Sequence, residues 1–162
     1  METKPRFNYT GYGFEGKMYD PNLGITDIAE RVRFFTKKQY PDCKFSVTIE
    51  RYSGGQSMDI ALMSAPFEVF NKEYTKDKNG NVYNERDWEY SQLNKYSLGK
   101  EADGYCNGSY LTPKAVEVLK FAYDVATAYN FDDSDGMIDY FHTNFYLHLA
   151  IGRWNKPFVK SN

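Results

Sequence analysis

Two neighbouring segments alternate apolar and polar residues with a period of two, and they constrain the fold more than any other feature of the chain. The apolar positions are Phe45, Val47 and Ile49 within residues 44–51, and Met58, Ile60 and Leu62 within residues 57–63. Such alternation is typical of strands that are buried on one side only. Because Tyr52-Ser53-Gly54-Gly55-Gln56 between them is typical of a turn, the two segments are predicted to form an antiparallel hairpin.

A helical period flanks this hairpin on both sides. A helix is predicted over residues 26–39, with Thr26 as its N-cap and Pro41 beyond its end. Its expected inner face comprises Ile25, Ile28, Ala29, Val32 and Phe35. A second helix is predicted over residues 112–129, with Thr112 as the cap and Pro113 at the first helical position.

The segment 144–151 is apolar on both faces of a strand and is therefore predicted to be central in its sheet or covered on both sides. Together these elements predict an α+β fold in one domain over residues 1–162. The expected sheet is antiparallel, contains the hairpin 44–51/57–63 at its centre and the strand 144–151, and is packed by the helices 26–39 and 112–129.

Composition excludes several classes of protein. The two cysteines, Cys43 and Cys106, are too few for a disulfide framework and indicate reduced thiols in a cytoplasmic protein. No apolar stretch is long enough to span a membrane, so no membrane partner is expected. The Gly-x-Gly-x-x-Gly string of residues 11–16 lacks the preceding buried strand and following helix of a dinucleotide site, and no cofactor is expected.

The formal charge of −2 is unevenly distributed along the chain. Basic residues outnumber acids in the section from residue 31 to residue 51, where aromatic residues are interleaved with them. Nucleic-acid-binding proteins use such basic residues for phosphates and aromatic rings for stacking. One hypothesis is therefore a nucleic-acid-binding module that uses Arg31, Arg33, Lys37, Lys38, Lys44 and Arg51.

A second hypothesis concerns Asp135, Asp139 and His142, which are spaced four and three residues apart. If that stretch is helical they share one face and would be candidate ligands of a divalent metal, so a metal-dependent enzyme is one alternative. His148 would add a ligand from the following strand. The competing interpretation is that His142 and His148 are ordinary, partly buried histidines bonded to their neighbours. No zinc signature, nucleophile elbow or phosphate loop is present, so no catalytic residue is assigned.

The segment 70–110 is polar and rich in Tyr, with no period beyond a possible short helix over residues 87–96. Tyr and Trp are enriched at protein interfaces. The residues predicted to bind a partner are Tyr83, Trp88, Tyr90 and Tyr96. The alternative is that these rings cover one face of the sheet.

Three strings of the chain resemble a known domain family, and they lie within residues 25–66: Asp27-Ile28-Ala29-Glu30-Arg31-Val32-Arg33, Tyr40-Pro41-Asp42-Cys43-Lys44-Phe45-Ser46-Val47 and Tyr52-Ser53-Gly54-Gly55-Gln56-Ser57-Met58-Asp59-Ile60. They are similar to the twenty-ninth type of large polyvalent protein-associated domain. The resemblance implies a helix that ends at a proline, followed by a Lys-Phe-Ser-Val strand and a second strand.

The same resemblance implies a biological context. Such domains occur in proteins of phages and conjugative elements, some of which are thought to protect incoming DNA from host defences. A chain of this size is therefore expected to be a small, non-enzymatic accessory protein in the cytoplasm of a bacterial host. Its expected partner is a host protein or nucleoprotein complex of the defence or DNA-handling machinery, which it would bind and inhibit, and direct contact with nucleic acid is possible.

Overall fold

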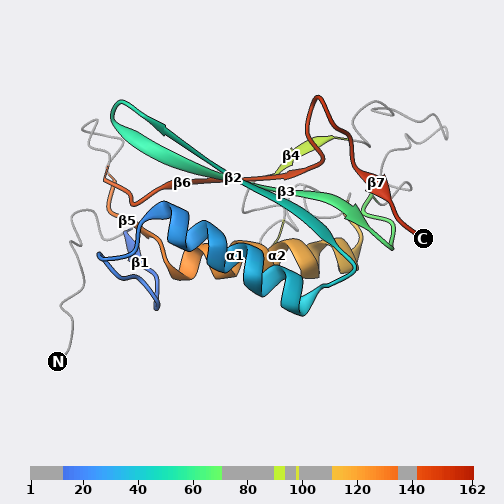
Figure 1. Cartoon of the computed structure of the whole chain (residues 1–162), viewed down its shortest axis with the longest axis horizontal. Coiled ribbons are helices and arrows are strands. Elements are labelled where there is room, and N and C mark those ends of the chain that lie inside the picture. The colour runs from blue at the N-terminus through green and yellow to red at the C-terminus, as the bar shows by residue number, and fades with distance from the viewer. Residues whose placement is uncertain (1–12, 71–89, 94–97, 99–110, 135–141) are drawn as a thin grey trace, which may run out of the picture.

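The computed structural model of the protein describes residues 13–70, 90–93, 98, 111–134 and 142–162. Its elements, in chain order, are β1 (Phe14–Glu15), α1 (Ile25–Gln39), β2 (Lys44–Tyr52), β3 (Gly55–Ala65), β4 (Ser91–Leu93), α2 (Pro113–Ala128), β5 (Phe131–Asp132), β6 (Tyr146–Ile151) and β7 (Val159–Lys160). Both helices lie on one side of the main sheet (Figure 1). The α+β class is confirmed.

The hairpin predicted from the alternation is present. Strands β2 and β3 pair in antiparallel register, with Val47 opposite Ile60 and Thr48 opposite Asp59. The turn between them contains Gly54 at a φ of 90°, a left-handed conformation that costs glycine far less than other residues. The strand order in the sheet is β2-β3-β6-β4, with β7 paired to the end of β3. The hairpin therefore supplies an edge strand, β2, and an inner strand, β3.

The sheet is mixed, and the expectation of a purely antiparallel sheet was wrong for the C-terminal strand. Strand β6 runs parallel to β3, with Asp59 beside His148 and Ile60 beside Leu149. Parallel neighbours require a long crossover connection, and in this chain the crossover includes α2. Strand β4 is antiparallel to β6.

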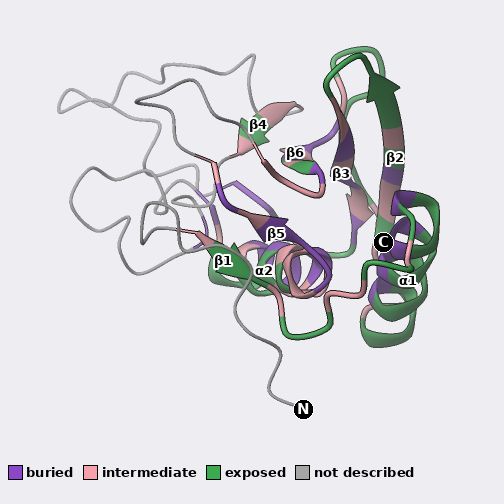
Figure 2. Cartoon of the chain, turned by 90° about the vertical axis from the view of Figure 1, so that its left-hand side faces the viewer, coloured by how far each residue is buried: buried purple, intermediate pink, exposed green. Residues whose placement is uncertain are grey.

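The core lies between the helices and the inner face of the sheet, as the buried residues in Figure 2 show. The buried side chains of the sheet alternate along β3, where Met58, Ile60 and Leu62 are inaccessible to solvent. The helices contribute Ile25, Ile28, Ala29, Val32, Thr36, Ala115, Val118, Leu119, Ala122 and Ala126. Burial of these apolar faces is the main stabilising term of the fold.

Two details of α1 differ from the sequence-based expectation. The N-cap is Gly24, whose backbone N–H donates to Asp27 Oδ2 at 3.1 Å, and Thr26 is not the cap. Phe35 is exposed and packs edge to face on Phe34, whereas Thr36 takes the buried position. The Thr36 hydroxyl can be buried because it donates to the Val32 carbonyl at 2.7 Å. At α2, the predicted cap is confirmed, since Ala115 N–H donates to Thr112 Oγ1.

Two strand expectations also need correction. Strand β6 lies between β3 and β4 and is central, as one of the two alternatives predicted, but it is not covered on both sides, because Tyr146 and His148 are exposed on the face away from the helices. Residues 91–93, which lie in the segment of the possible short helix, form β4, because Gln92 pairs with Ala150 across the sheet. No helix in the described part of the chain is both long and apolar enough to cross a membrane.

Candidate functional site

The sheet presents a polar face on the side away from the helices, which we call the second face. It follows from strand alternation, because the residues between the buried positions of β2, β3 and β6 point the other way. Thr48, Asp59 and His148 lie side by side across these three strands. Neither α1 nor α2 lies on this face (Figure 1). The second face is therefore a polar surface built on the rigid centre of the sheet.

His148 and Asp59 form a hydrogen-bonded pair on the second face. Nδ1 of His148 lies 2.9 Å from Oδ1 of Asp59. Because an ionised carboxylate only accepts hydrogen bonds, the Nδ1 atom must carry the proton. The Nε2 atom has no hydrogen-bond partner among the described residues and is therefore available to a ligand.

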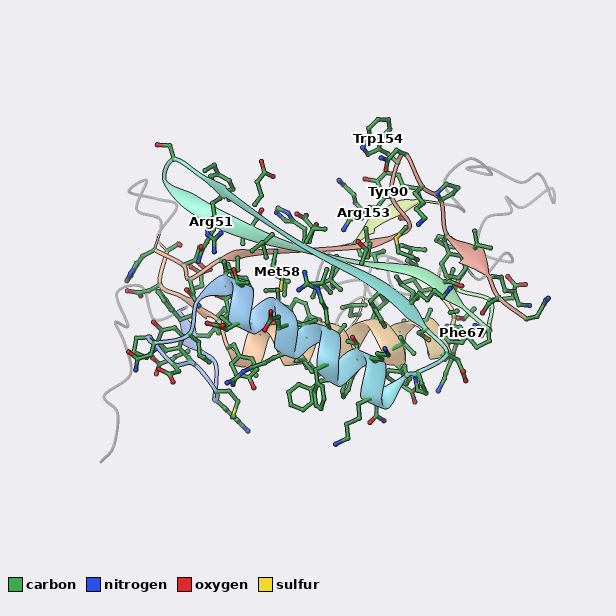
Figure 3. The ribbon with its side chains drawn as sticks, in the orientation of Figure 1. Arg51, Met58, Phe67, Tyr90, Arg153 and Trp154 are labelled. Atoms are coloured by element: carbon green, nitrogen blue, oxygen red, sulfur yellow. The ribbon has the colours of Figure 1, made fainter. Side chains whose placement is uncertain are left out.

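A tight turn after β6 brings a cation over this face. Gly152 has a φ of 65° and donates its N–H to the Leu62 carbonyl at 2.9 Å. Arg153 and Lys156 then exchange two backbone hydrogen bonds, of 2.8 and 3.0 Å, which close a turn with Trp154 and Asn155 at its tip. In Figure 3, Trp154 stands on the side of the sheet opposite the helices, and Arg153 lies between it and the strands.

Arg153 is held across the sheet by two hydroxyl groups of β2. Its Nε and Nη2 atoms donate to Ser46 Oγ at 3.2 and 3.0 Å, and Nη2 also donates to Thr48 Oγ1 at 3.2 Å. Among the described residues, no carboxylate forms an ion pair with it. The guanidinium is charged at any accessible pH. Its position is therefore fixed while its charge is uncompensated.

These side chains surround a hollow of about 550 Å³, which we call the Arg153 hollow. It is lined by Thr48, Asp59, Ile60, Ala61, Tyr90, Gln92, Leu93, His148, Leu149, Ala150, Gly152, Arg153, Trp154 and Asn155. The side chains that Ala61 and Ala150 contribute are small, which leaves room above the sheet. Trp154 is 82% exposed. The hollow thus combines a fixed cation, a His–Asp pair, two amide side chains and an exposed aromatic ring.

The family model of large polyvalent protein associated domain 29 matches residues 23–118, which is more than half of the chain. The chain belongs to this family. No curated protein and no solved structure matches the chain. The matched part of this polyvalent-protein domain includes α1, β2, β3 and β4, and hence Thr48, Asp59 and Tyr90 of the hollow. His148, Arg153 and Trp154 lie beyond the matched residues.

One of the residues predicted to bind a partner lies at the Arg153 hollow, within the part of the chain that matches the polyvalent-protein domain. Tyr90 is half-buried and lines the hollow next to β4 (Figure 3). Tyr83, Trp88 and Tyr96 lie outside the described residues.

The basic residues 31–51 of the domain are largely engaged in contacts within the fold. Arg33 Nη2 donates to the Val47 carbonyl at 2.6 Å, and Arg51 Nη2 donates to Thr26 Oγ1 at 3.0 Å. Two others lie over aromatic rings, Arg31 at 5.1 Å from the Tyr129 centroid and Lys38 at 6.0 Å from that of Phe34. Lys37 and Lys44 are exposed. The structure uses much of this charge to hold α1 against its neighbours.

Of the three metal-ligand candidates, only His142 belongs to the described part of the chain. Its ring packs at 4.9 Å from that of Phe131, and its backbone carbonyl accepts from Asp133 N–H. Asp135 and Asp139 lie outside the described residues. Among the residues that the structure does describe, no three His, Cys, Asp or Glu side chains are grouped so that they could hold a metal ion.

Sequence reasoning missed Asp59, Arg153 and Trp154 of the hollow, and it singled out His148 only as an additional metal ligand. The Gly-Arg-Trp-Asn string directly after a predicted strand was a usable signal, since it places an arginine and a tryptophan on a turn at the edge of a sheet. No local pattern links Asp59 to His148, because they are 89 residues apart and meet only through the pairing of β3 with β6.

Proposed function

We propose that this chain is a non-enzymatic binding protein of a phage or another mobile element, and that it binds and inhibits a host defence or DNA-handling complex through the Arg153 hollow. One observation carries the proposal. A cation without an ionic partner among the described residues is fixed beside a tryptophan that is 82% exposed. An exposed ring beside an arginine without an ionic partner does little to stabilise the fold, whereas a bound ligand would cover the ring and pair with the charge.

Physical chemistry supports a binding role for these two residues. Trp and Arg are the residue types that most often dominate the binding energy of an interface. The Ser46 and Thr48 hydroxyls hold the guanidinium in place before any partner arrives, which reduces the side-chain entropy lost on binding. Arg153 and Trp154 lie on the turn after β6, which is closed by two backbone hydrogen bonds between Arg153 and Lys156, while the strands β3 and β6 supply Asp59 and His148.

The family supports the context. The chain belongs to a domain family described as associated with large polyvalent proteins. The resemblance of residues 25–66 to this family implies that the chain comes from a phage or a conjugative element. Its place of action would then be the cytoplasm of a bacterial host.

The experiment is affinity capture from a lysate of the native host, read by mass spectrometry. The tagged chain is compared with Arg153→Glu and Trp154→Ala, and with Lys37→Glu as the control. Lys37 lies on the exposed side of α1, on the opposite side of the sheet, and its variant makes the same change of charge. We expect Arg153→Glu and Trp154→Ala each to lose at least about tenfold of the captured partner, with unchanged melting temperatures. Equal capture by all four proteins would contradict the proposal.

A further inference from the structure

We infer that the group bound in the Arg153 hollow is a single-stranded nucleic acid, with a phosphate at Arg153 and a base stacked on Trp154. This inference rests on the proposed function, because it names the chemistry of the partner at the same site. It uses different residues from the basic section 31–51.

The first argument is the state of the guanidinium. Hydroxyl groups of Ser46 and Thr48 position Nε and Nη2 without neutralising their charge. Nη1 has no hydrogen-bond partner among the described residues and is free to donate. A fixed arginine of this kind favours a planar or tetrahedral oxyanion, which in a macromolecule is a carboxylate or a phosphate.

The second argument decides between those two anions. Trp154 follows Arg153 directly in the chain and lines the same hollow. Stacking on an aromatic ring next to a phosphate contact is the usual way in which proteins bind single strands. The amide side chains of Gln92 and Asn155 also line the hollow and can bond to base edges. A single carboxylate would pair with the cation alone, whereas one nucleotide supplies a phosphate for Arg153, a ring for Trp154 and polar base edges for the amides.

The third argument places the strand within the hollow. Asp59 would repel a phosphate, although its Oδ1 atom is bonded to His148. The phosphate therefore belongs at the Arg153 side, away from Asp59, and the neutral base lies against the exposed ring of Trp154. A volume of about 550 Å³ lies in the range of small-ligand sites and suits one nucleotide unit.

The same geometry favours a single strand over a duplex. A base can stack on Trp154 only if it leaves the stack of its own helix, which costs a few kcal/mol in paired DNA. An unpaired base does not incur that cost. The formal net charge of the chain is −2, so we expect few phosphate contacts. The logarithm of the binding constant should therefore fall only slowly with the logarithm of the salt concentration, with a slope of about −0.7 for each phosphate contacted in a single strand.

The test is a fluorescence anisotropy titration of the full chain with labelled twelve-nucleotide oligo-dT and oligo-rU and a twelve-base-pair duplex. The variants are Arg153→Gln, Trp154→Ala and Trp154→Phe, with Lys37→Gln as the matched control. We expect single strands to bind more tightly than duplex, and Trp154→Ala to lose affinity roughly five- to one-hundred-fold. Trp154→Phe should recover part of that loss, because a smaller ring still stacks. Arg153→Gln should weaken binding and flatten the salt dependence, whereas Lys37→Gln should not.

No binding of any oligonucleotide, or equal binding by the intact chain, Trp154→Ala and Arg153→Gln, would overturn the inference. The capture experiment, repeated after nuclease treatment, separates it from the proposed function. Capture that depends on Arg153 and is lost after nuclease supports both. Capture that depends on Arg153 and survives nuclease indicates a protein ligand, which overturns the inference and leaves the proposed function standing. Capture that does not depend on Arg153 overturns the proposed function itself.

Discussion

Arg33 of α1 donates a hydrogen bond of 2.6 Å to the backbone carbonyl of Val47 on the edge strand β2. Strand β2 has nine residues and a free edge in the described sheet. Exposed edges of this length are sites where sheets of different molecules pair and aggregate. The arginine thus occupies a backbone acceptor and also ties the helix to the strand.

We expect Arg33→Ala to lower the free energy of unfolding by about 1 to 2 kcal/mol, because it removes a partly buried, charged hydrogen bond, and to increase self-association. Urea denaturation and light scattering across a concentration series measure the two effects. Lys37→Ala, an exposed change on the same helix, is the control. If Arg33→Ala self-associates no more than Lys37→Ala and is equally stable, the contact has no role in protecting the edge.

The His148–Asp59 pair predicts the tautomer of the imidazole. Because the Asp59 carboxylate accepts from Nδ1 at 2.9 Å, neutral His148 should carry its proton on Nδ1 and not on Nε2. Long-range ¹H–¹⁵N correlation spectra distinguish the two tautomers directly. Asp59→Asn should shift the population towards the Nε2-protonated form, with only a small loss of stability because the pair is exposed. A dominant Nε2-protonated form in the unmodified chain would contradict the geometry.

Gly152 and Gly54 offer a matched pair of backbone substitutions. Both adopt positive φ, at 65° and 90°, where an alanine costs about 1 to 2 kcal/mol. We expect Gly152→Ala and Gly54→Ala to lower stability by similar amounts. Only Gly152→Ala should weaken binding at the Arg153 hollow, because Gly152 directs the turn that carries Arg153 and Trp154. Equal binding losses in both variants would show that the effect comes from general destabilisation.

Burial raises the pKa of the Cys43 thiol, the charge of Asp42 raises it further, and Lys114 partly opposes them. The thiolate is the reactive form, so at pH 8 the native thiol should be alkylated several-fold more slowly than the same thiol in guanidinium chloride. Because the folded-state pKa is the higher one, this group destabilises the fold as the pH rises above the ordinary thiol value of about 8.5.

The measurement is a rate of iodoacetamide labelling across a pH series, in a Cys106→Ser background so that only Cys43 reacts. The rate should keep rising at pH values where the unfolded chain has already reached its plateau. Identical pH profiles in the native and unfolded proteins would contradict the raised pKa.

The sequence alone determined the local elements. A period of two in residues 44–63 and a period of 3.6 in the two helices assign each side chain to a face, and the hairpin and both helices follow with boundaries within two residues. Within an element, the prediction of the buried residues was wrong where either of two adjacent side chains could have pointed into the core. Thr36 displaced Phe35 because its hydroxyl is bonded to the preceding turn and its smaller side chain is fully buried.

Only the tertiary structure decided the partners of those faces. Periodicity fixes which way a side chain points, but it does not say which strand lies beside it or in which direction the chain returns. The crossover through α2 brought β6 parallel to β3 and placed His148 beside Asp59. The turn at Gly152 then laid Arg153 over hydroxyls that are 107 and 105 residues away in the chain. The candidate site consists of such long-range contacts, and for that reason the local sequence pattern pointed to Tyr90 and His148 separately, without the contacts that bring them to one hollow.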